Sequence, residues 1–236
     1  MRRRFSIGLT GGIGSGKTEA LRRFSALGAA TISLDEIAHE QSRPGGPAFL
    51  KMIRAFGRQI LDESGCIDRK KVADRVFLNS NLRKRLERLT HPLILKEMQS
   101  QMKLLFGIVV VDVPLLFEGR HEKNFDATLA VLAPANVRLH RVSKRDRLSP
   151  SEIRKRMFAQ ISDEERMKRA DVVIDNDGDL AAFHQDVKRY YQAFCLIVTT
   201  QVTPAQAGVQ NSDFLDSGLR RNDEPEQLHL INQEQR

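Results

Sequence analysis

The segment Gly11–Thr18 constrains the fold of this chain more than any other part of its sequence. It reads Gly-Gly-Ile-Gly-Ser-Gly-Lys-Thr and fits the pattern G-x-x-x-x-G-K-[ST]. The apolar segment Phe5–Leu9 before it predicts a short buried strand, and the pattern from Thr18 to about Leu27 predicts a helix. A strand, a glycine-rich loop and a helix in this order form a site for nucleotide phosphates. We therefore expect a nucleoside triphosphate to bind at this loop.

The residue types of the loop explain how it would hold a triphosphate. Glycines let the backbone turn so that several N–H groups converge on the β- and γ-phosphates, and the following helix adds the positive end of its dipole. Lys17 would place a cation on the same oxygens, and Thr18 would offer a hydroxyl ligand to Mg²⁺. The expected nucleotide contacts are Gly12, Ile13, Gly14, Ser15, Gly16, Lys17, Thr18 and Glu19. A glycine-rich turn without a ligand is the alternative, which the flanking strand and helix disfavour.

Further apolar segments alternate with segments of helical periodicity along the chain. The expected strands are Thr31–Leu34, Ile108–Val111, Thr128–Leu132 and Val172–Ile174. The run Ile108–Val111 is continuously apolar, as in a central parallel strand that is covered on both faces. Strands that alternate with helices favour a parallel sheet with right-handed crossovers. The sequence therefore predicts an α/β fold of three layers, with a five-stranded parallel sheet in the middle.

Residues 43–106 depart from this alternation. Arg43–Pro47 contains two prolines and two glycines and marks a break, and the following pattern is helical with little strand character. Three helix starts are expected within it: Arg69 after the cap Asp68, then Asn79 or Ser80, then His91–Pro92. The sequence therefore predicts a helical insertion between strands, with the sheet and its helices in residues 1–42 and 107–197. Residues 198–236 lack a periodic apolar face, and we expect a disordered tail there.

The composition of the 236 residues is that of a globular protein, with 41% hydrophobic residues. No apolar run approaches the roughly 20 residues needed to cross a bilayer. Met1–Arg4 resembles the start of a signal peptide, but the apolar stretch Phe5–Leu9 is shorter than the roughly 7–15 residues that a signal requires. Cys66 and Cys195 are far apart, in no metal-ligand spacing, and fit a reducing cytosol. We therefore expect a cytoplasmic protein without a membrane segment.

The net charge of the chain is +8, and it rises to +11 without residues 201–236, which hold 3 basic and 6 acidic residues. A basic body suits polyanionic ligands, either nucleotides or nucleic acid, and a basic surface without a specific partner is the alternative. A nucleic-acid-binding regulator that uses ATP as a switch would fit this charge. The chain has only 2 Tyr and no Trp, so it offers few platforms for base stacking. We therefore expect no nucleic acid partner.

Two aspartates lie where expected strands end. Asp35 follows Thr31–Leu34, at the edge of the sheet where ligands bind, and it could accept or orient the proton of an attacking hydroxyl. The alternative is that it only caps the next helix. Asp112 closes Ile108–Val111 and resembles an acid that holds Mg²⁺ or its water, with a turn-stabilising role as the alternative. An N-K-x-D segment for guanine is absent from the sequence, so these acids favour an ATP-dependent kinase over a GTPase.

A group of basic residues surrounds a second helix start. Ser149-Pro150-Ser151-Glu152 is a capping box. The arginines near it are Arg141, Arg145, Arg154 and Arg156. Together they could close over ATP as a lid and place guanidinium groups where charge develops, although each one alone could be a solvated surface residue. His91, before Pro92, could contact a ligand, with a helix cap or a packed residue as the alternative.

The chain resembles the dephospho-coenzyme A kinase family in a series of motifs. They are Gly8–Thr18, Leu34–Ala38, His91–Ile94, Val113–Glu118, Arg156 with Gln160, and Ala170–Gly178. These motifs follow the family's order and spacing from about Phe5 to Leu196. The first is shared with many kinases, whereas the Thr-Gly-Gly-Ile-Gly-Ser-Gly-Lys, Val-Pro-Leu-Leu and Asn-Asp-Gly segments together are specific.

The resemblance implies a P-loop kinase that transfers the γ-phosphoryl group of ATP to the ribose 3′-hydroxyl of dephospho-coenzyme A. The products would be coenzyme A and ADP, in the last step of coenzyme A synthesis, with Mg²⁺ as the metal. The resemblance also implies a helical substrate domain within residues 43–106 and a lid near residues 143–169. We expect a monomer or a weak homo-oligomer.

Individual residues match the family's site residues. Asp35 matches the general base, and Arg141 and Arg156 match phosphate-contacting arginines. Asn176 matches the loop on the adenine side. On the acceptor side, the matched motifs point to His91 and Leu116. With Lys17 and Arg141, Asp35 completes the expected catalytic set.

The chain departs from the family in two places. The family usually reads Asp-Ala-Asp where this chain reads Ser33-Leu34-Asp35, so a carboxylate that could tune Asp35 or bind substrate is missing. We expect activity to survive this change. The segment after about Ile197 matches nothing in the family. Because the composition of the insertion says little about its ligand, a nucleoside or nucleotide kinase on the same scaffold is the alternative function.

Overall fold

A computed structural model of the chain describes residues 3–77 and 79–200. Its strands are β1 (Arg4–Gly11), β2 (Ala30–Ser33), β3 (Gly107–Asp112), β4 (Ala127–Leu132) and β5 (Val172–Asp175). They pair in the order β2-β3-β1-β4-β5, and every pair is parallel. This confirms the predicted five-stranded parallel sheet. Because β3 and β4 lie on opposite sides of β1, the carboxyl end of β1 is a topological switch point, where such sheets bind ligands.

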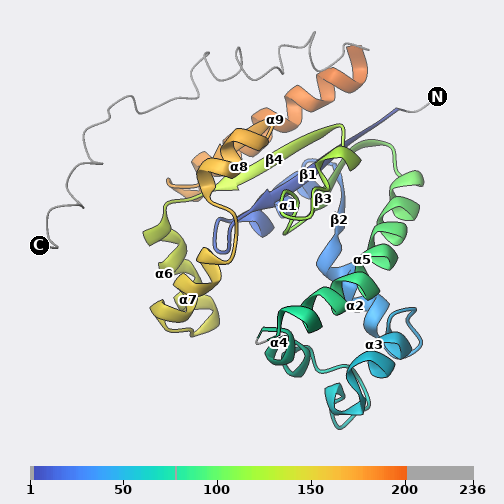
Figure 1. Ribbon diagram of the computed structural model, residues 1–236. Coiled ribbons are helices and arrows are strands. Elements are labelled where there is room, and N and C mark those ends of the chain that lie inside the picture. The colour runs from blue at the N-terminus through green and yellow to red at the C-terminus, as the bar shows by residue number, and fades with distance from the viewer. Residues whose placement is uncertain (1–2, 78, 201–236) are drawn as a thin grey trace, which may run out of the picture.

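Two layers of helices cover the sheet, which confirms the three-layer α/β architecture (Figure 1). Helices α1 (Lys17–Ala26) and α9 (Leu180–Thr200) pack on one face through Phe24, Phe183 and Phe194. On the other face, α2 (Leu34–Ser42) contributes Ile37, and the final turns of α5 (Ser80–Lys103) contribute Met98 and Met102. Each such side chain stabilises the fold by about 1.5–3 kcal/mol when it is fully buried.

The helical insertion has a small core of its own. It contains α3 (Phe49–Phe56), the 3₁₀ turn η1 (Arg58–Ile60), α4 (Arg69–Phe77) and the first turns of α5. Met52, Phe56, Ile60 and Val72 are buried together in this core. Oδ1 of Asp68 accepts a hydrogen bond from the backbone N–H of Lys70 at 2.8 Å, so the predicted cap of α4 is confirmed.

The prediction of a helix start at His91–Pro92 is wrong, because α5 continues through both residues to Lys103. Pro92 lacks an N–H group and cannot bond to the carbonyl of Arg88, yet the helix continues. Its apolar side chains explain why. The core of the insertion is packed by Leu82, Leu86, Leu89 and Leu93. The core between the sheet and helix α2, which we call the main core, is packed by Ile94, Leu95, Met98 and Met102. A single helix therefore joins the two cores.

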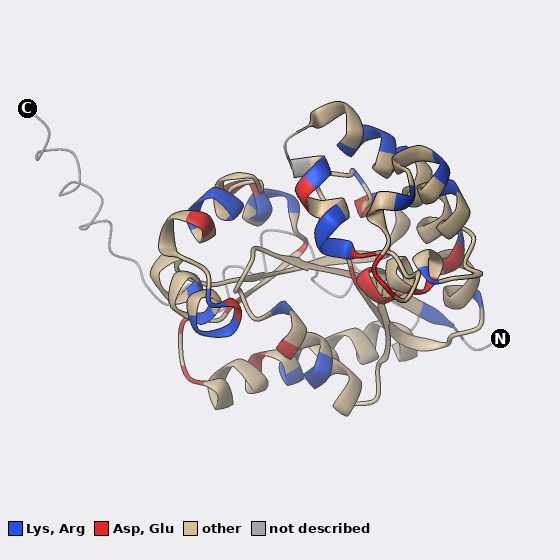
Figure 2. Cartoon of the chain, turned by 90° about the horizontal axis from the view of Figure 1, so that it is seen from below, with Lys and Arg blue, Asp and Glu red and all other residues tan. Residues whose placement is uncertain are grey.

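Three helices follow β4 along the chain. They are α6 (Ala135–Asp146), α7 (Pro150–Phe158) and α8 (Asp163–Arg169). The capping box at Ser149 is confirmed, since Ser149 and Glu152 exchange side-chain and backbone hydrogen bonds. Figure 1 shows α6 and α7 on one side of the sheet and the insertion helices α3 and α4 on the other. Figure 2 shows Lys and Arg on both groups of helices.

The last helix extends further than the sequence predicts. Val198 packs against the core between the sheet and helices α1 and α9, and α9 extends to Thr200, so residues 198–200 belong to the helix and not to a tail. The remainder of the expected tail, residues 201–236, lies outside the described residues. A short 3₁₀ turn, η2 (Glu122–Asn124), precedes β4. Within residues 3–77 and 79–200, none of the helices combines the length and the apolar character that a membrane span requires.

Candidate active site

The phosphate loop, Gly11–Thr18, joins the central strand β1 to helix α1. The backbone of Gly14 has φ +77° and that of Gly16 has φ +101°, and side chains other than hydrogen rarely occur in this left-handed region. Gly16 is the N-cap of α1, so the positive end of the helix dipole faces the loop. The N–H of Ser15 donates to the carbonyl of Gly12 at 3.1 Å and closes the turn. The local geometry is that of an anion-binding loop.

Lys17 forms an ion pair with Asp112, the last residue of β3. Asp112 lies opposite Leu9 of β1 and Ser33 of β2 in the sheet, so its carboxylate is held at the edge where the phosphate loop begins. Burial raises the pKa of Asp112, and the charges of Asp35 and Glu36 raise it further, while the nearby Lys17 ammonium lowers it. Strands β2 and β3 are neighbours in the sheet, so Asp112 at the end of β3 and Asp35 just after β2 are close enough to repel each other.

Asn176 and Arg141 fix the phosphate loop from the side of β5. Nδ2 of Asn176 donates to the carbonyl of Ser15 at 2.7 Å. Nη2 of Arg141 donates at 3.2 Å both to the carbonyl and to Oδ1 of Asn176. Nη1 of Arg141 is buried and has no hydrogen-bond partner among the described residues. The structure thus brings both predicted residues to the loop and leaves a guanidinium donor free for an anion.

A further pair of arginines lies under the loop, and the sequence reasoning missed both. Arg138 and Arg166 are 8% and 1% exposed, and each forms an ion pair with Asp163 at 2.8 Å. A Cβ atom added to Gly12 would clash with Nη1 of Arg138, so the guanidinium lies directly against the loop. The side chain of Gln160 accepts a hydrogen bond from the N–H of Ile13 at 2.9 Å. The start of α8 therefore supports the phosphate loop from outside.

Asp35 lies in the first turn of α2, directly after β2. The residue that caps this helix is Ser33, whose hydroxyl accepts from the N–H of Glu36 at 3.3 Å. The alternative that Asp35 only caps the helix is therefore wrong, and its carboxylate is available for another role. The strand also ends one residue earlier than predicted, since Leu34 begins the helix.

Asp35 lines a cavity of about 270 Å³ between α2, α5 and the segment after β3, which we call the acceptor cavity. Its polar side chains are Asp35, Glu87, His91, Glu118 and His121. Its apolar side chains are Leu34, Ala38, Ile94, Leu95, Val113, Pro114 and Leu115. A largely apolar cavity with a few convergent polar groups is the usual form of a small-molecule site.

The two histidines of the cavity face each other, with ring centroids 6.1 Å apart and the rings near perpendicular. Burial lowers the pKa of His121, and the neighbouring His91 lowers it further, while Glu122 opposes this. His91 lines the acceptor cavity, and its expected contact with the acceptor stays a prediction. Leu116 is different, because its side chain is completely buried in the main core, and its neighbours Pro114 and Leu115 line the cavity instead.

Some predicted residues lie further from these contacts. Arg156 is exposed on α7. The hydrogen bond from Arg145 lowers the pKa of Asp146, and the hydrogen bonds from Ser149 lower that of Glu152, while the charge of Arg156 contributes a smaller effect to both. Arg145 is engaged in an ion pair with Asp146 at 2.7 Å. Glu19, next to Thr18, pairs with His184 of α9 at 2.8 Å. The structure brings none of these side chains into contact with Lys17 or Asp35.

Of the two missed arginines, Arg138 had a weak signal in the sequence. Arg138 and Arg141 are three residues apart on α6, so they share a face of that helix. Because α6 follows β4 at the same edge of the sheet as the phosphate loop, that face is directed toward the loop. Arg166 gave no such signal, because its burial depends on Glu118, which is distant in the sequence, as well as on Asp163 of the same helix.

Known proteins resemble this chain over most of its length. The family model described as dephospho-CoA kinase matches residues 5–182. The dephospho-CoA kinase of Methylococcus capsulatus is 40% identical over 195 residues, which cover 81% of this chain and 97% of that protein. The dephospho-CoA kinase of Chromobacterium violaceum is 42% identical over 183 residues, which cover 77% of this chain and 90% of that protein.

Solved structures resemble the described fold as well. A crystal structure of a Thermus thermophilus protein matches with a TM-score of 0.72 and 31% identity, and it covers 81% of this chain and 98% of that chain. The dephospho-CoA kinase from Campylobacter jejuni matches with a TM-score of 0.57 and 29% identity, over 81% of this chain and 97% of that chain.

Proposed function

The chain belongs to the dephospho-CoA kinase family, and we propose that it transfers the γ-phosphoryl group of ATP to the ribose 3′-hydroxyl of dephospho-coenzyme A. The observation that carries this proposal is the placement of Lys17, Asp112 and Asp35 at one edge of the sheet. A phosphate loop and its lysine meet a free carboxylate in an adjoining cavity there. Donor and acceptor would therefore bind at the same edge, where proximity favours transfer between them.

On the donor side, backbone N–H groups of the phosphate loop and the ammonium of Lys17 bind the β- and γ-phosphates. Arg141 supports this role, because its free Nη1 atom lies beside the loop and can neutralise charge on the moving group. The carboxylate of Asp112 now pairs with Lys17. Lys17 would exchange this partner for phosphate oxygens as ATP binds.

The Thr18 hydroxyl and the Asp112 carboxylate would hold Mg²⁺. Both supply hard oxygen ligands, and Mg²⁺ in phosphotransferases takes one or two protein ligands while phosphates and waters complete its octahedron. Clusters of three or more His, Cys, Asp or Glu side chains that could hold a metal are absent from the described residues, which fits such a sparse donor set. Held by these two residues, Mg²⁺ would reduce the negative charge of the phosphates.

On the acceptor side, Asp35 is the group that accepts the proton of the 3′-hydroxyl. Its carboxylate lines the acceptor cavity, and Ser33 rather than Asp35 satisfies the N-terminus of α2. As the oxygen attacks the γ-phosphorus in line, the bond from that phosphorus to the β,γ-bridging oxygen breaks and ADP leaves. Asp35 removes the hydroxyl proton as the new bond forms.

The test is ADP release by the full chain, with ATP, Mg²⁺ and dephospho-coenzyme A as the only acceptor. We expect release to depend on the acceptor and coenzyme A to accumulate in equal amount. A panel of nucleosides and nucleoside monophosphates, assayed in the same way, tests the alternative of another small-molecule kinase. Turnover of one of these acceptors without turnover of dephospho-coenzyme A would overturn the proposal.

A further inference from the structure

A second cavity, of about 730 Å³, adjoins the acceptor cavity along α5. We call it the basic cavity, and its lining residues are Asn81, Lys84, Glu87, Arg88, His91 and Pro92. Glu87 and His91 line both cavities, so these two side chains form a shared border. The acceptor cavity has a mostly apolar wall, whereas the basic cavity has two permanent cations in its wall.

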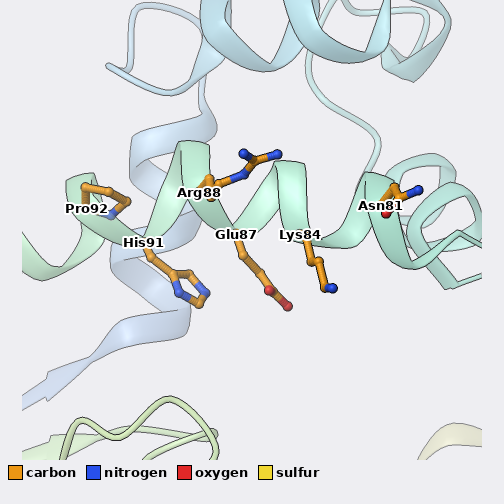
Figure 3. A pocket seen from close by; sticks show the side chains of 6 residues that line it. All are labelled: Asn81, Lys84, Glu87, Arg88, His91 and Pro92. Atoms are coloured by element: carbon orange, nitrogen blue, oxygen red, sulfur yellow. The ribbon is translucent and has the colours of Figure 1, made fainter.

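Figure 3 shows how these side chains leave the helix. Lys84, Glu87 and His91 project from the same side of α5, and Arg88 projects from the other side in that view. Lys84 and His91 are seven positions apart, which corresponds to about 10.5 Å along a helix axis. The cavity wall therefore runs for two helical turns away from the border that His91 marks.

We propose that the basic cavity binds the diphosphate group of dephospho-coenzyme A through Lys84 and Arg88. This inference rests on the proposed function, which requires the 3′-hydroxyl of the acceptor to lie at Asp35. The acceptor cavity, at about 270 Å³, is smaller than the roughly 300–1,000 Å³ typical of sites for drug-sized ligands. It has room for the nucleoside end but not for all of dephospho-coenzyme A, so the remainder must leave it.

The covalent structure of dephospho-coenzyme A decides which of its groups lies just outside the acceptor cavity. The diphosphate is attached to the 5′-carbon of the same ribose, a few covalent bonds from the 3′-hydroxyl. A ligand with its ribose at Asp35 that extends along α5 past His91 places its diphosphate next to Lys84. On another side, the acceptor cavity is lined by Val113, next to Asp112 and its partner Lys17, where the phosphates of ATP would bind.

The charges of the basic cavity fit this ligand. Neither Lys84 nor Arg88 forms an ion pair or a side-chain hydrogen bond with any described residue, so both charges are available. Glu87 carries the opposite charge and borders the acceptor cavity, where it can accept hydrogen bonds from ribose hydroxyls. Repulsion by Glu87 keeps the diphosphate further along the helix, toward Lys84. The cations thus fix the direction in which the acceptor enters.

The experiment compares Lys84→Ala, the double variant Lys84→Ala with Arg88→Ala, and the control Arg85→Ala, an exposed cation of α5 outside the cavity wall. We expect KM for dephospho-coenzyme A to rise about tenfold in Lys84→Ala and about fiftyfold or more in the double variant, since each cation makes charge-assisted hydrogen bonds. We expect kcat, KM for ATP and all constants of Arg85→Ala to stay within about twofold of wild type. Adenosine, which lacks the diphosphate, should inhibit wild type and Lys84→Ala equally.

Two results would overturn the inference. One is a KM for dephospho-coenzyme A within about twofold of wild type in the double variant. The other is an equal rise of KM for dephospho-coenzyme A in Arg85→Ala. That result would indicate that the positive charge of the helix as a whole, and not a subsite, attracts the ligand. If the wild type does not phosphorylate dephospho-coenzyme A, the proposed function itself fails. Calorimetric binding of dephospho-coenzyme A to wild type and double variant then still tests the subsite, because equal affinities would refute it.

Discussion

Lys17, the lysine of the phosphate loop, forms an ion pair with Asp112 at the carboxyl end of the neighbouring strand β3. Only 15% of the Lys17 side chain and 9% of the Asp112 side chain are exposed. The parallel pairing of β1 with β3 thus holds Lys17, which would bind phosphate, next to Asp112, which would bind a metal. The ion pair holds both side chains in position until a ligand separates them.

Replacement of Lys17 by alanine tests the donor side. We expect Lys17→Ala to lose most of its affinity for ATP and at least about 10² in turnover, because the ammonium neutralises the β- and γ-phosphates. Equilibrium binding of ATP and ADP release measure the two effects. The control is Lys51→Ala, an exposed lysine on α3. If Lys17→Ala bound ATP as well as the wild type, the phosphate-loop assignment would be wrong.

Replacement of Asp35 by asparagine tests the acceptor side. The amide keeps the shape of the side chain but cannot accept the proton of the 3′-hydroxyl, so turnover should fall by about 10² or more. ATP affinity should not change, because Asp35 lies in the acceptor cavity and not in the phosphate loop. Glu40→Gln, on the exposed side of α2, is the matched control. Turnover of Asp35→Asn within a few-fold of wild type would exclude Asp35 as the base.

Ser33, where the resemblance led us to expect an aspartate, is the N-cap of α2. Ser33→Ala should lower the free energy of unfolding by about 1 kcal/mol, whereas Ser33→Asp should keep the cap, since serine and aspartate cap helices about equally well. Urea unfolding measures both. Equal stability of Ser33→Ala and wild type would show that the 3.3 Å hydrogen bond contributes nothing.

The sheet and the phosphate loop were predictable because their signals are local. A continuous apolar run such as Ile108–Val111 has few alternatives to a buried parallel strand, and the loop motif fixes the strand before it and the helix after it. The position of Asp112 followed from the end of its strand. The placement of Asp35 followed for the same reason, although the strand ends at Ser33 and not at Leu34.

The features that the sequence did not predict depend on contacts between segments that are distant along the chain. Pro92 suggested a helix start, but the leucines of α5 pack on two cores and keep the helix continuous, a tertiary effect that the local pattern does not contain. Arg166 is 1% exposed because Asp163 and Glu118 surround its guanidinium. A sequence pattern would place such an arginine on the surface.

His121 predicts a pH dependence of stability. Its pKa is lowered in the folded state, by burial first and by His91 second, so the unfolded chain binds more protons below its ordinary pKa of about 6.5. The contribution of His121 is therefore fully present above that pH and is lost as the pH falls through it. The urea midpoint of His121→Asn should decrease less than that of wild type between pH 7.5 and pH 5.5 (about two units across the ordinary pKa). The exposed His140→Asn is the control, and parallel curves for His121→Asn and wild type would contradict the prediction.

Gly16 offers a test of the link between the phosphate loop and Asn176. A Cβ atom at Gly16 would clash with Nδ2 of Asn176, the atom that donates to the carbonyl of Ser15, and the backbone has φ +101°. Gly16→Ala should therefore displace Asn176, disturb the loop and lower ATP affinity about tenfold or more. Gly65→Ala is matched for backbone strain, because Gly65 has φ +79° but no atoms within 4 Å of an added Cβ. It should lose about 1 kcal/mol of stability and bind ATP normally. Equal ATP affinities of the two variants would show that the contact with Asn176 does not hold the loop in its binding geometry.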